Sequence, residues 1–242
     1  MTLPVGILAL AASAAVLFVG GALQGVAGFG MGLIALPVLL RVLPAETVVP
    51  LMTALAWVMN VQIFFKLWRN ADLRVIAVFL LGACVGTQLG VYIPSLVPPR
   101  LFQIAVGLLI CLSGLAIWKG WRVSLRGLLP RFAVGALSGA LGASISLSGP
   151  PIAIFMTAGG VPKNTFRSST ALYFLLLNTV TLFTFGAHGA LDARFVRLLV
   201  WLLPSLVLGT ACGVRLGTRV PEEKFRAVVI VLIFVSGLSL LL

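Results

Sequence analysis

Hydrophobic segments long enough to cross a membrane follow one another along almost all of the 242-residue chain. A bilayer core about 30 Å thick requires roughly 20 apolar residues for each spanning helix. Only 9% of the residues are charged, against roughly 25% in soluble domains, and nearly all of them lie in short loops. We therefore predict an all-α polytopic membrane protein. The segments cover approximately residues 3–43, 47–66, 73–95, 101–118, 132–162, 166–187, 195–218 and 225–242.

The second half of the chain repeats the first half in the same order. Residues 21–28 (GALQGVAG) and 135–142 (GALSGALG) are identical at five of eight positions, and the same offset pairs Pro37 with Pro151. Further pairs are Thr53 with Thr170, Asn60 with Asn178, Asp72 with Asp192, and the glycine ladder Gly82, Gly86 and Gly90 with the ladder Gly209, Gly213 and Gly217. The spacing of the ladders predicts close helix contacts.

This duplication predicts two transmembrane repeats of about four hydrophobic segments each. They are residues 1–120 and 132–242, joined by a basic cytoplasmic linker, 121–131, in one integrated domain. Internal repeats of this kind are common in secondary transporters, in which the substrate site lies at the repeat interface.

The first segment of each repeat is too long for one straight helix across the bilayer, and small residues interrupt it at 25–32 and 139–149. Each is predicted to be a broken helix or a re-entrant hairpin. If all eight segments cross once, the two sides carry 9 and 8 lysines and arginines; if both first segments return, the counts are 13 and 4. The positive-inside rule favours the second arrangement. It predicts inverted-topology repeats with both termini in the periplasm.

The two returning arms predict an anion-binding site at the membrane midplane. A helix that begins there directs unpaired N–H groups and the positive end of its dipole toward the centre. The first arm follows a glycine-rich stretch, and the second follows alternating serines and two prolines. The residues predicted to bind substrate here are Gly28, Phe29, Gly30, Gly32, Gly142, Ser144, Ser146 and Ser148. The alternative is that these small residues only permit tight helix packing.

Polar residues in the apolar segments extend this candidate substrate site. Asn60 and Asn178 occupy equivalent positions, and an amide at this depth is costly without a partner. Thr53 and Thr170 precede them on the same helices, and Gln24 is a further candidate. Hydrogen bonding between helices is the alternative role.

Two cations lie at helix ends, Lys66 and Arg167. Their side chains either extend toward lipid headgroups or line the anion's path into the protein.

The positions of the ionisable residues disfavour enzymatic and metal-dependent functions. The five acidic residues and the single histidine, His188, lie in loops or at helix ends, so the apolar segments offer no carboxylate or imidazole to transfer protons or bind zinc. The three cysteines match no metal or disulfide spacing. The net charge of +12 lies at the ends of apolar runs, where anionic lipid explains it better than nucleic acid. We predict no enzymatic activity, cofactor or metal, and leave a homodimer open.

The glycine-rich stretches and both ladders resemble those of the TauE/SafE-type sulfite exporters, the transmembrane sulfite permease family. The similarity consists of residues 21–37 (GALQGVAGFGMGLIALP) with Pro44, residues 135–151 (GALSGALGASISLSGPP) with Pro162, and the two ladders. It implies a multi-pass permease of the bacterial inner membrane for small sulfur-containing anions such as sulfite or sulfoacetate. Ser144 and Ser146 stand where the first stretch has Gly30 and Gly32, and members of the family differ in substrate.

These observations together suggest transport by alternating access, with the anion held at the midplane by helix N-termini and by Ser and Asn side chains. An anion channel of similar selectivity and a non-transporting membrane scaffold subunit are the alternatives.

Overall fold

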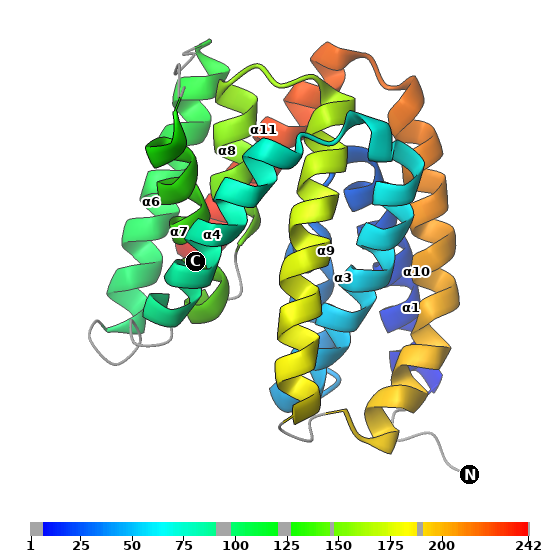
Figure 1. The fold of residues 1–242 in the computed structure, drawn as a ribbon. Helices are drawn as coiled ribbons and strands as arrows, with labels where there is room; N and C mark the ends of the chain where they lie inside the picture. The colour runs from blue at the N-terminus through cyan, green and yellow to red at the C-terminus, as the bar shows by residue number, and fades with distance from the viewer. Residues whose placement is uncertain (1–6, 91–97, 121–126, 146–147, 188–190, 242) are drawn as a thin grey trace. The chain divides into compact units, whose positions relative to one another are not determined.

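The computed structural model describes residues 7–90, 98–120, 127–145, 148–187 and 191–241, which form helices joined by short connections (Figure 1). The first half contains α1 (Ile7–Ala27), α2 (Met31–Leu40), α3 (Ala45–Leu67) with a 3-10 turn at Trp68–Asn70, α4 (Leu73–Gly90) and α6 (Pro99–Trp118). The second half contains α7 (Leu128–Ile145), α8 (Gly149–Ala158), α9 (Lys163–Ala187), α10 (Ala193–Arg219) and α11 (Glu222–Leu241). None of these described residues is in a strand, and the all-α prediction is confirmed.

The length and surface of the helices fit a lipid environment. By length and composition, α1, α3, α4, α9 and α10 each contain a stretch able to cross a membrane, and shorter apolar helices lie in α6, α7 and α8. Large apolar side chains, among them Phe65, Leu129 and Phe183, are exposed at the surface. Apolar surface on this scale is stable against lipid tails rather than water. The prediction of a polytopic membrane protein is confirmed.

The first segment of each predicted repeat is a broken helix, as expected. Three residues separate α1 from the ten-residue helix α2, and three residues separate α7 from the ten-residue helix α8. At 1.5 Å per residue, α2 and α8 are each about 15 Å long, or about half of a bilayer core.

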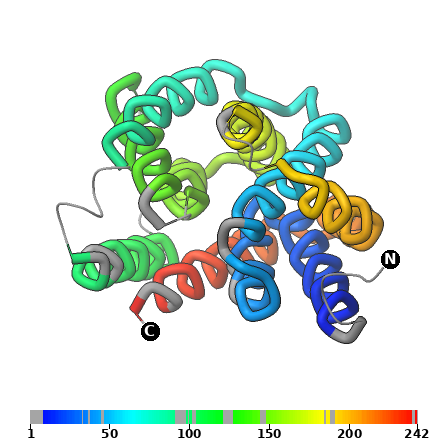
Figure 2. The backbone as a smooth tube through the Cα atoms, turned by 90° about the horizontal axis from the view of Figure 1, so that it is seen from below, coloured from blue at the N-terminus to red at the C-terminus, as the bar shows by residue number. Residues whose placement is uncertain are grey.

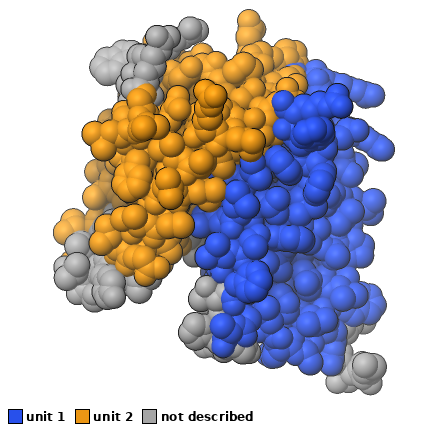
Figure 3. Space-filling model, viewed as in Figure 1, with its two compact units in different colours: residues 1–69, 170–220 blue, residues 70–169, 221–242 orange. Residues whose placement is uncertain are grey.

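The helices form two compact units, and each unit combines elements from both halves of the chain (Figure 3). Unit 1 consists of residues 1–69 and 170–220 and therefore holds α1, α2, α3, most of α9, and α10. Unit 2 consists of residues 70–169 and 221–242 and holds α4, α6, α7, α8, the start of α9, and α11. A repeat in the sequence is therefore not a packing unit in this fold. Residues 121–126 of the predicted basic linker lie outside the described residues.

In unit 1, the second glycine ladder packs against α1, which lies beside α10 (Figure 2). Gly209 contacts the backbone of Phe18, and Gly213 contacts the backbone of Ala22. A Cβ on Gly25 would lie 2.8 Å from the carbonyl oxygen of Thr210. Since the contacts advance in the same direction on both helices, α1 and α10 are parallel.

In unit 2, the first glycine ladder packs against α7 in the same manner. Gly82 contacts the backbone of Phe132, and Gly86 contacts that of Ala136. A Cβ on Gly90 would lie 2.5 Å from the carbonyl oxygen of Ala140. Phe132 and Ala136 thus play the part in α7 that Phe18 and Ala22 play in α1. The predicted role of both ladders in close helix contact is confirmed.

Replacing Gly86 by Ala is expected to lower the thermal stability of the purified protein. The added methyl would meet the backbone of Ala136, which a rigid helix cannot move aside, and overpacking of this kind costs about 1–3 kcal/mol. Gly186→Ala is the matched control, because its Cβ would meet only Leu191 Cδ1 at an ordinary 3.6 Å. Equal melting temperatures for the two variants, measured in detergent, would show that the ladder contact is not close-packed.

The last helices of the two halves, α6 and α11, form an antiparallel pair in unit 2. Arg100 Nη2, at the start of α6, donates a hydrogen bond of 2.8 Å to the carbonyl oxygen of Leu241, at the end of α11. Further along, a Cβ on Gly237 would lie 2.5 Å from Cys111 Sγ, and one on Gly114 would lie 3.1 Å from Ile233 Cγ2. The end of α6 and the start of α11 therefore meet at one end of the pair.

Candidate anion-binding site

The first break, Gly28 to Gly30 in unit 1, turns the chain back along α1. Gly28 and Gly30 have φ values of 85° and 111°, in the left-handed region that residues with a Cβ rarely adopt. Met31 Cγ lies 3.2 Å from the position that a Cβ on Gly20 would take, although eleven residues separate them. A straight helix would hold these residues about 16 Å apart, so α2 begins beside α1 rather than continuing it. Phe29 is buried within this turn.

Gln24 joins the start of α2 to α3. The backbone N–H of Met31 donates to Gln24 Oε1 at 3.1 Å, and Gln24 Nε2 donates to Asn60 Oδ1 at 3.3 Å. Gly30 has no side chain to cap α2, so Gln24 supplies the acceptor from the preceding helix. Gln24 is 6% exposed and Asn60 is fully buried. The structure therefore brings together two of the predicted substrate-binding side chains.

Hydrogen-bond donors at this break have capacity left for a ligand. Asn60 Nδ2 is buried and has no hydrogen-bond partner among the described residues. The N–H groups of residues 32 and 33, in the first turn of α2, have no intrahelical acceptor. Gly32 is exposed, and a Cβ built on it would meet nothing within 4 Å. The first break thus combines a free amide donor, a helix N-terminus and open space, which together suit an oxyanion.

The second break, between α7 and α8 in unit 2, is closed by a different side chain. Ser138 Oγ, on α7, donates a 2.6 Å hydrogen bond to the carbonyl oxygen of Ser148, at the start of α8. A Cβ on Gly142 would lie 3.2 Å from Ser148 Cβ, so this chain also turns back. Ser138 is the counterpart of Gln24 in the repeated motif, and it was missing from the predicted site. The alignment of residues 21–28 with residues 135–142 pairs Gln24 with Ser138, so the sequence contained a signal for this residue.

The start of α8 offers fewer donors than the start of α2. Pro150 and Pro151 occupy the second and third positions of α8 and have no N–H group, so only Gly149 and Ile152 carry one among its first four residues. Ser148, the residue before the helix, makes no side-chain capping bond. Ser146 and the side chain of Ser144 lie outside the described residues.

Pro37 and Pro151, which the offset of the repeat pairs, hold different positions in their helices. Pro37 is the seventh residue of α2, whereas Pro151 is the third residue of α8. The cause is a difference in helix length, because α1 ends just before Gly28 but α7 continues past the equivalent Gly142 to Ile145. This extra helical turn shifts the second break along the sequence.

The two predicted asparagines are not equivalent in the fold. Asn178 is half-buried in α9. Its neighbour Thr179 instead accepts a 2.9 Å bond from Trp57 Nε1, which links α3 to α9 within unit 1. Thr53 donates to the carbonyl oxygen of Val49 in its own helix at 2.9 Å.

The remaining predicted site residues lie at helix ends or in the buried part of α9. Thr170 is 1% exposed. Lys66 is exposed at the end of α3, as expected for a side chain that reaches the membrane surface. Arg167 is fully buried instead, so extension toward lipid headgroups is excluded for it. His188 lies outside the described residues, and within the described ranges no three His, Cys, Asp or Glu side chains cluster as metal ligands.

Broken helices whose N-termini offer donors inside an apolar helical protein define a membrane transport protein of the discontinuous-helix class. The family model for the sulfite exporters TauE/SafE matches residues 13–240, nearly the whole chain. The chain belongs to the TauE/SafE sulfite exporter family. No curated protein and no solved structure matches it.

Proposed function

We propose that this protein moves small sulfur-containing anions, such as sulfite or the organosulfonate sulfoacetate, across the bacterial inner membrane by alternating access. The anion accepts hydrogen bonds from the start of α2 and from Asn60. The single observation that carries the proposal is the buried Nδ2 of Asn60, which has no hydrogen-bond partner among the described residues and which Gln24 joins to the N-terminus of α2.

The charges of the site explain why its ligand is an anion. Both groups with spare capacity, the amide Nδ2 and the backbone N–H groups, are donors, and the α2 dipole places partial positive charge at the same point. Acceptors nearby are already engaged, because Gln24 Oε1 receives the Met31 N–H and Asn60 Oδ1 receives Gln24 Nε2. A cation would find no free carboxylate among these residues, whereas a sulfite or sulfonate group presents several acceptor oxygens.

The antiparallel arrangement of α6 and α11 supports the inverted topology that we propose, with both termini in the periplasm. α6 and α11 are the fourth and the eighth hydrophobic segments. If every segment crossed the membrane once, an even number of crossings would separate the starts of these two helices, so both would start on the same side and be parallel. If the first segment of each repeat returns to the side on which it began, the second half is reversed and α6 and α11 are antiparallel. The Arg100–Leu241 hydrogen bond agrees with this arrangement. The same topology places the most basic loops in the cytoplasm.

The two breaks have different roles in this proposal. The first supplies most of the donors, and the second, where Pro150 and Pro151 remove two N–H groups, supplies serine hydroxyls and a tightly closed turn. Thr53, Thr170, Asn178 and the serines are further proposed substrate-binding residues, and Lys66 and Arg167 are proposed for the path of the anion. Movement of one half of the protein against the other exposes the anion to each side in turn.

Counterflow in proteoliposomes tests the transport function. Vesicles preloaded with sulfite, sulfate, thiosulfate, taurine or sulfoacetate are diluted into trace labelled sulfite. We expect saturable uptake that internal sulfite or a sulfonate accelerates, because a carrier exchanges bound anions faster than it returns empty. Flux that does not saturate and shows no acceleration would identify an anion channel. Absence of flux with every anion, from protein that remains folded, would identify a scaffold subunit.

A further inference from the structure

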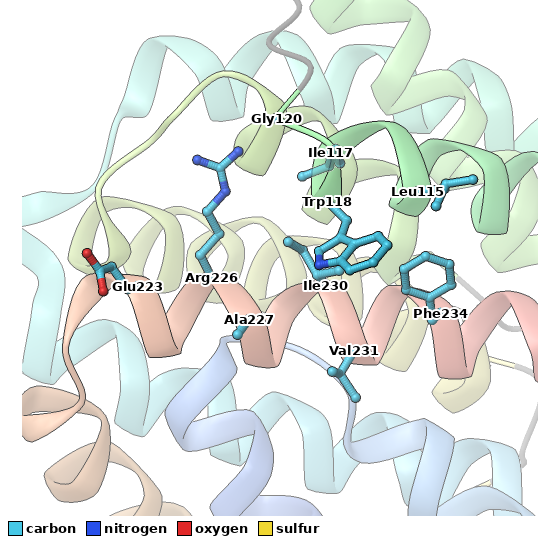
Figure 4. Close-up of a pocket in the computed structure, with 10 residues that line it drawn as sticks. All are labelled: Leu115, Ile117, Trp118, Gly120, Glu223, Arg226, Ala227, Ile230, Val231 and Phe234. Carbon is cyan, nitrogen blue, oxygen red and sulfur yellow. The ribbon is translucent and has the colours of Figure 1, made fainter.

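A groove of about 670 Å³ lies in unit 2 between the end of α6 and the start of α11 (Figure 4). This volume falls within the range of roughly 300–1,000 Å³ typical of ligand sites. Leu115, Ile117 and Trp118 line it from α6, and Ala227, Ile230, Val231 and Phe234 line it from α11. Its walls are therefore apolar along most of their length.

The groove opens toward the surroundings of the protein. Trp118 is 69% exposed and Val231 is 58% exposed, so the apolar walls continue into the lipid-facing surface. Trp118 is the last residue of α6, and tryptophan at the end of a spanning helix is typical of the membrane–water interface. A ligand in this groove would have apolar material along the helices and a polar end near Trp118.

One cationic side chain, Arg226, lines the polar end of the groove. Figure 4 shows it extending from α11 toward Gly120, just beyond the end of α6. The exposed Lys119 and Lys224 lie at the same end of the helix pair. An acid, Glu223 in the first turn of α11, also lines this end of the groove, and the dipole of α11 offsets its charge. Its neighbour Glu222 accepts the backbone N–H of Lys163 at 2.9 Å.

We propose that this groove binds an anionic phospholipid, with an acyl chain along α11 and the phosphate on Arg226. Guanidinium groups bind phosphate through charge-assisted, bidentate hydrogen bonds, and basic pockets between spanning helices suit anionic headgroups. The apolar walls accept a hydrocarbon chain and the cationic end accepts a negative headgroup, so the two parts of the groove match the two parts of one lipid. The lining of this groove includes no residue of either helix break.

Native mass spectrometry of the full-length protein in detergent tests the site. Phosphatidylglycerol and phosphatidylcholine with identical acyl chains are titrated against the wild type and against Arg226→Gln, Lys224→Gln and Ala227→Trp. We expect phosphatidylglycerol to bind about ten-fold more weakly to Arg226→Gln, because a hydrogen-bonded charge is lost. Lys224→Gln removes the same charge two residues away, outside the groove lining, and is expected to bind within two-fold of the wild type. Ala227→Trp fills the groove and is expected to weaken the binding of both lipids.

Each contrary result overturns the proposal. Equal losses of phosphatidylglycerol affinity in Arg226→Gln and Lys224→Gln would show a general attraction between the lipid and the basic loops. Equal binding of the two lipids by the wild type would exclude a headgroup site, and full competition by soluble glycerol 3-phosphate would identify a free phosphate as the ligand. A change from dimer to monomer in Ala227→Trp, with lipid binding intact, would identify a second copy of the chain as the occupant. Melting temperatures of all variants verify that each is folded.

Discussion

The Gln24→Leu variant is expected to lose sulfite binding and about 2 kcal/mol of stability, because it removes a helix cap and leaves a buried acceptor without a donor. Gln24 Oε1 accepts the Met31 N–H, and Gln24 Nε2 satisfies Asn60 Oδ1. Leucine has a similar size but neither group. Without the cap, α2 is free to change its direction after Gly30, and the donors that it presents no longer converge with Asn60.

Anion-dependent thermal shift of the purified protein measures both effects in one experiment. A ligand that binds only the folded state raises the melting temperature in proportion to the logarithm of its concentration, so the shift reports affinity and the ligand-free value reports stability. Gln62→Leu is the matched control, since it makes the same substitution at an amide of α3 whose Nε2 has no hydrogen-bond partner among the described residues. Stability at or above the wild-type value is expected for Gln62→Leu. An unchanged sulfite-induced shift in Gln24→Leu would exclude the first break as the anion site.

The Asn60→Asp variant is expected to weaken anion affinity by at least 100-fold. The change keeps an oxygen that can accept from Gln24 Nε2 but replaces the free Nδ2 donor with a second acceptor. At pH values at which the new carboxyl is ionised, it also places a negative charge at the start of α2, where the substrate would bring its own. Like charges in a site of low dielectric repel strongly, and the lost donor adds to the penalty.

Equilibrium binding of labelled sulfite to detergent-solubilised protein measures this loss. Gln62→Glu is the control for charge, because it adds a carboxyl to the same helix two residues away, on a different face. Asn60→Leu separates the two causes, since it removes the donor without adding charge and is expected to weaken affinity by about ten-fold. An Asn60→Asp protein that binds sulfite as tightly as Gln62→Glu would contradict the assignment of Asn60 to the site.

The repeat in the sequence and the packing of the helices follow different rules in this protein. Each half contains a broken first helix, but the glycine ladder of one half packs against the first helix of the other half. Gly209 and Gly213 need α1, and Gly82 and Gly86 need α7, because only a neighbouring backbone fills the space that their missing side chains leave. Neither half can therefore complete its own packing unit, and the duplicated chain folds as two mixed units.

Sequence alone was sufficient for the helical membrane class, the broken first segments and the contact role of the ladders. These features depend on local properties: apolar length, the conformational freedom of glycine, and small residues at a four-residue spacing. The family resemblance was also accessible from the motifs, and the family match over residues 13–240 confirms it.

Tertiary structure decided which polar residues act together. Gln24 and Asn60 are 36 positions apart, and only the return of the chain at Gly30 and the packing of α3 bring their amides within hydrogen-bonding distance. Asn178 has the equivalent place in the sequence, but its neighbour Thr179 makes the contact with α3. Ser138 closes the second break by donating to the carbonyl oxygen of Ser148, a bond that only the turn of the chain makes possible. Hydrogen bonds of this kind depend on positions in space to within a few tenths of an ångström, which hydrophobic pattern and residue type do not determine.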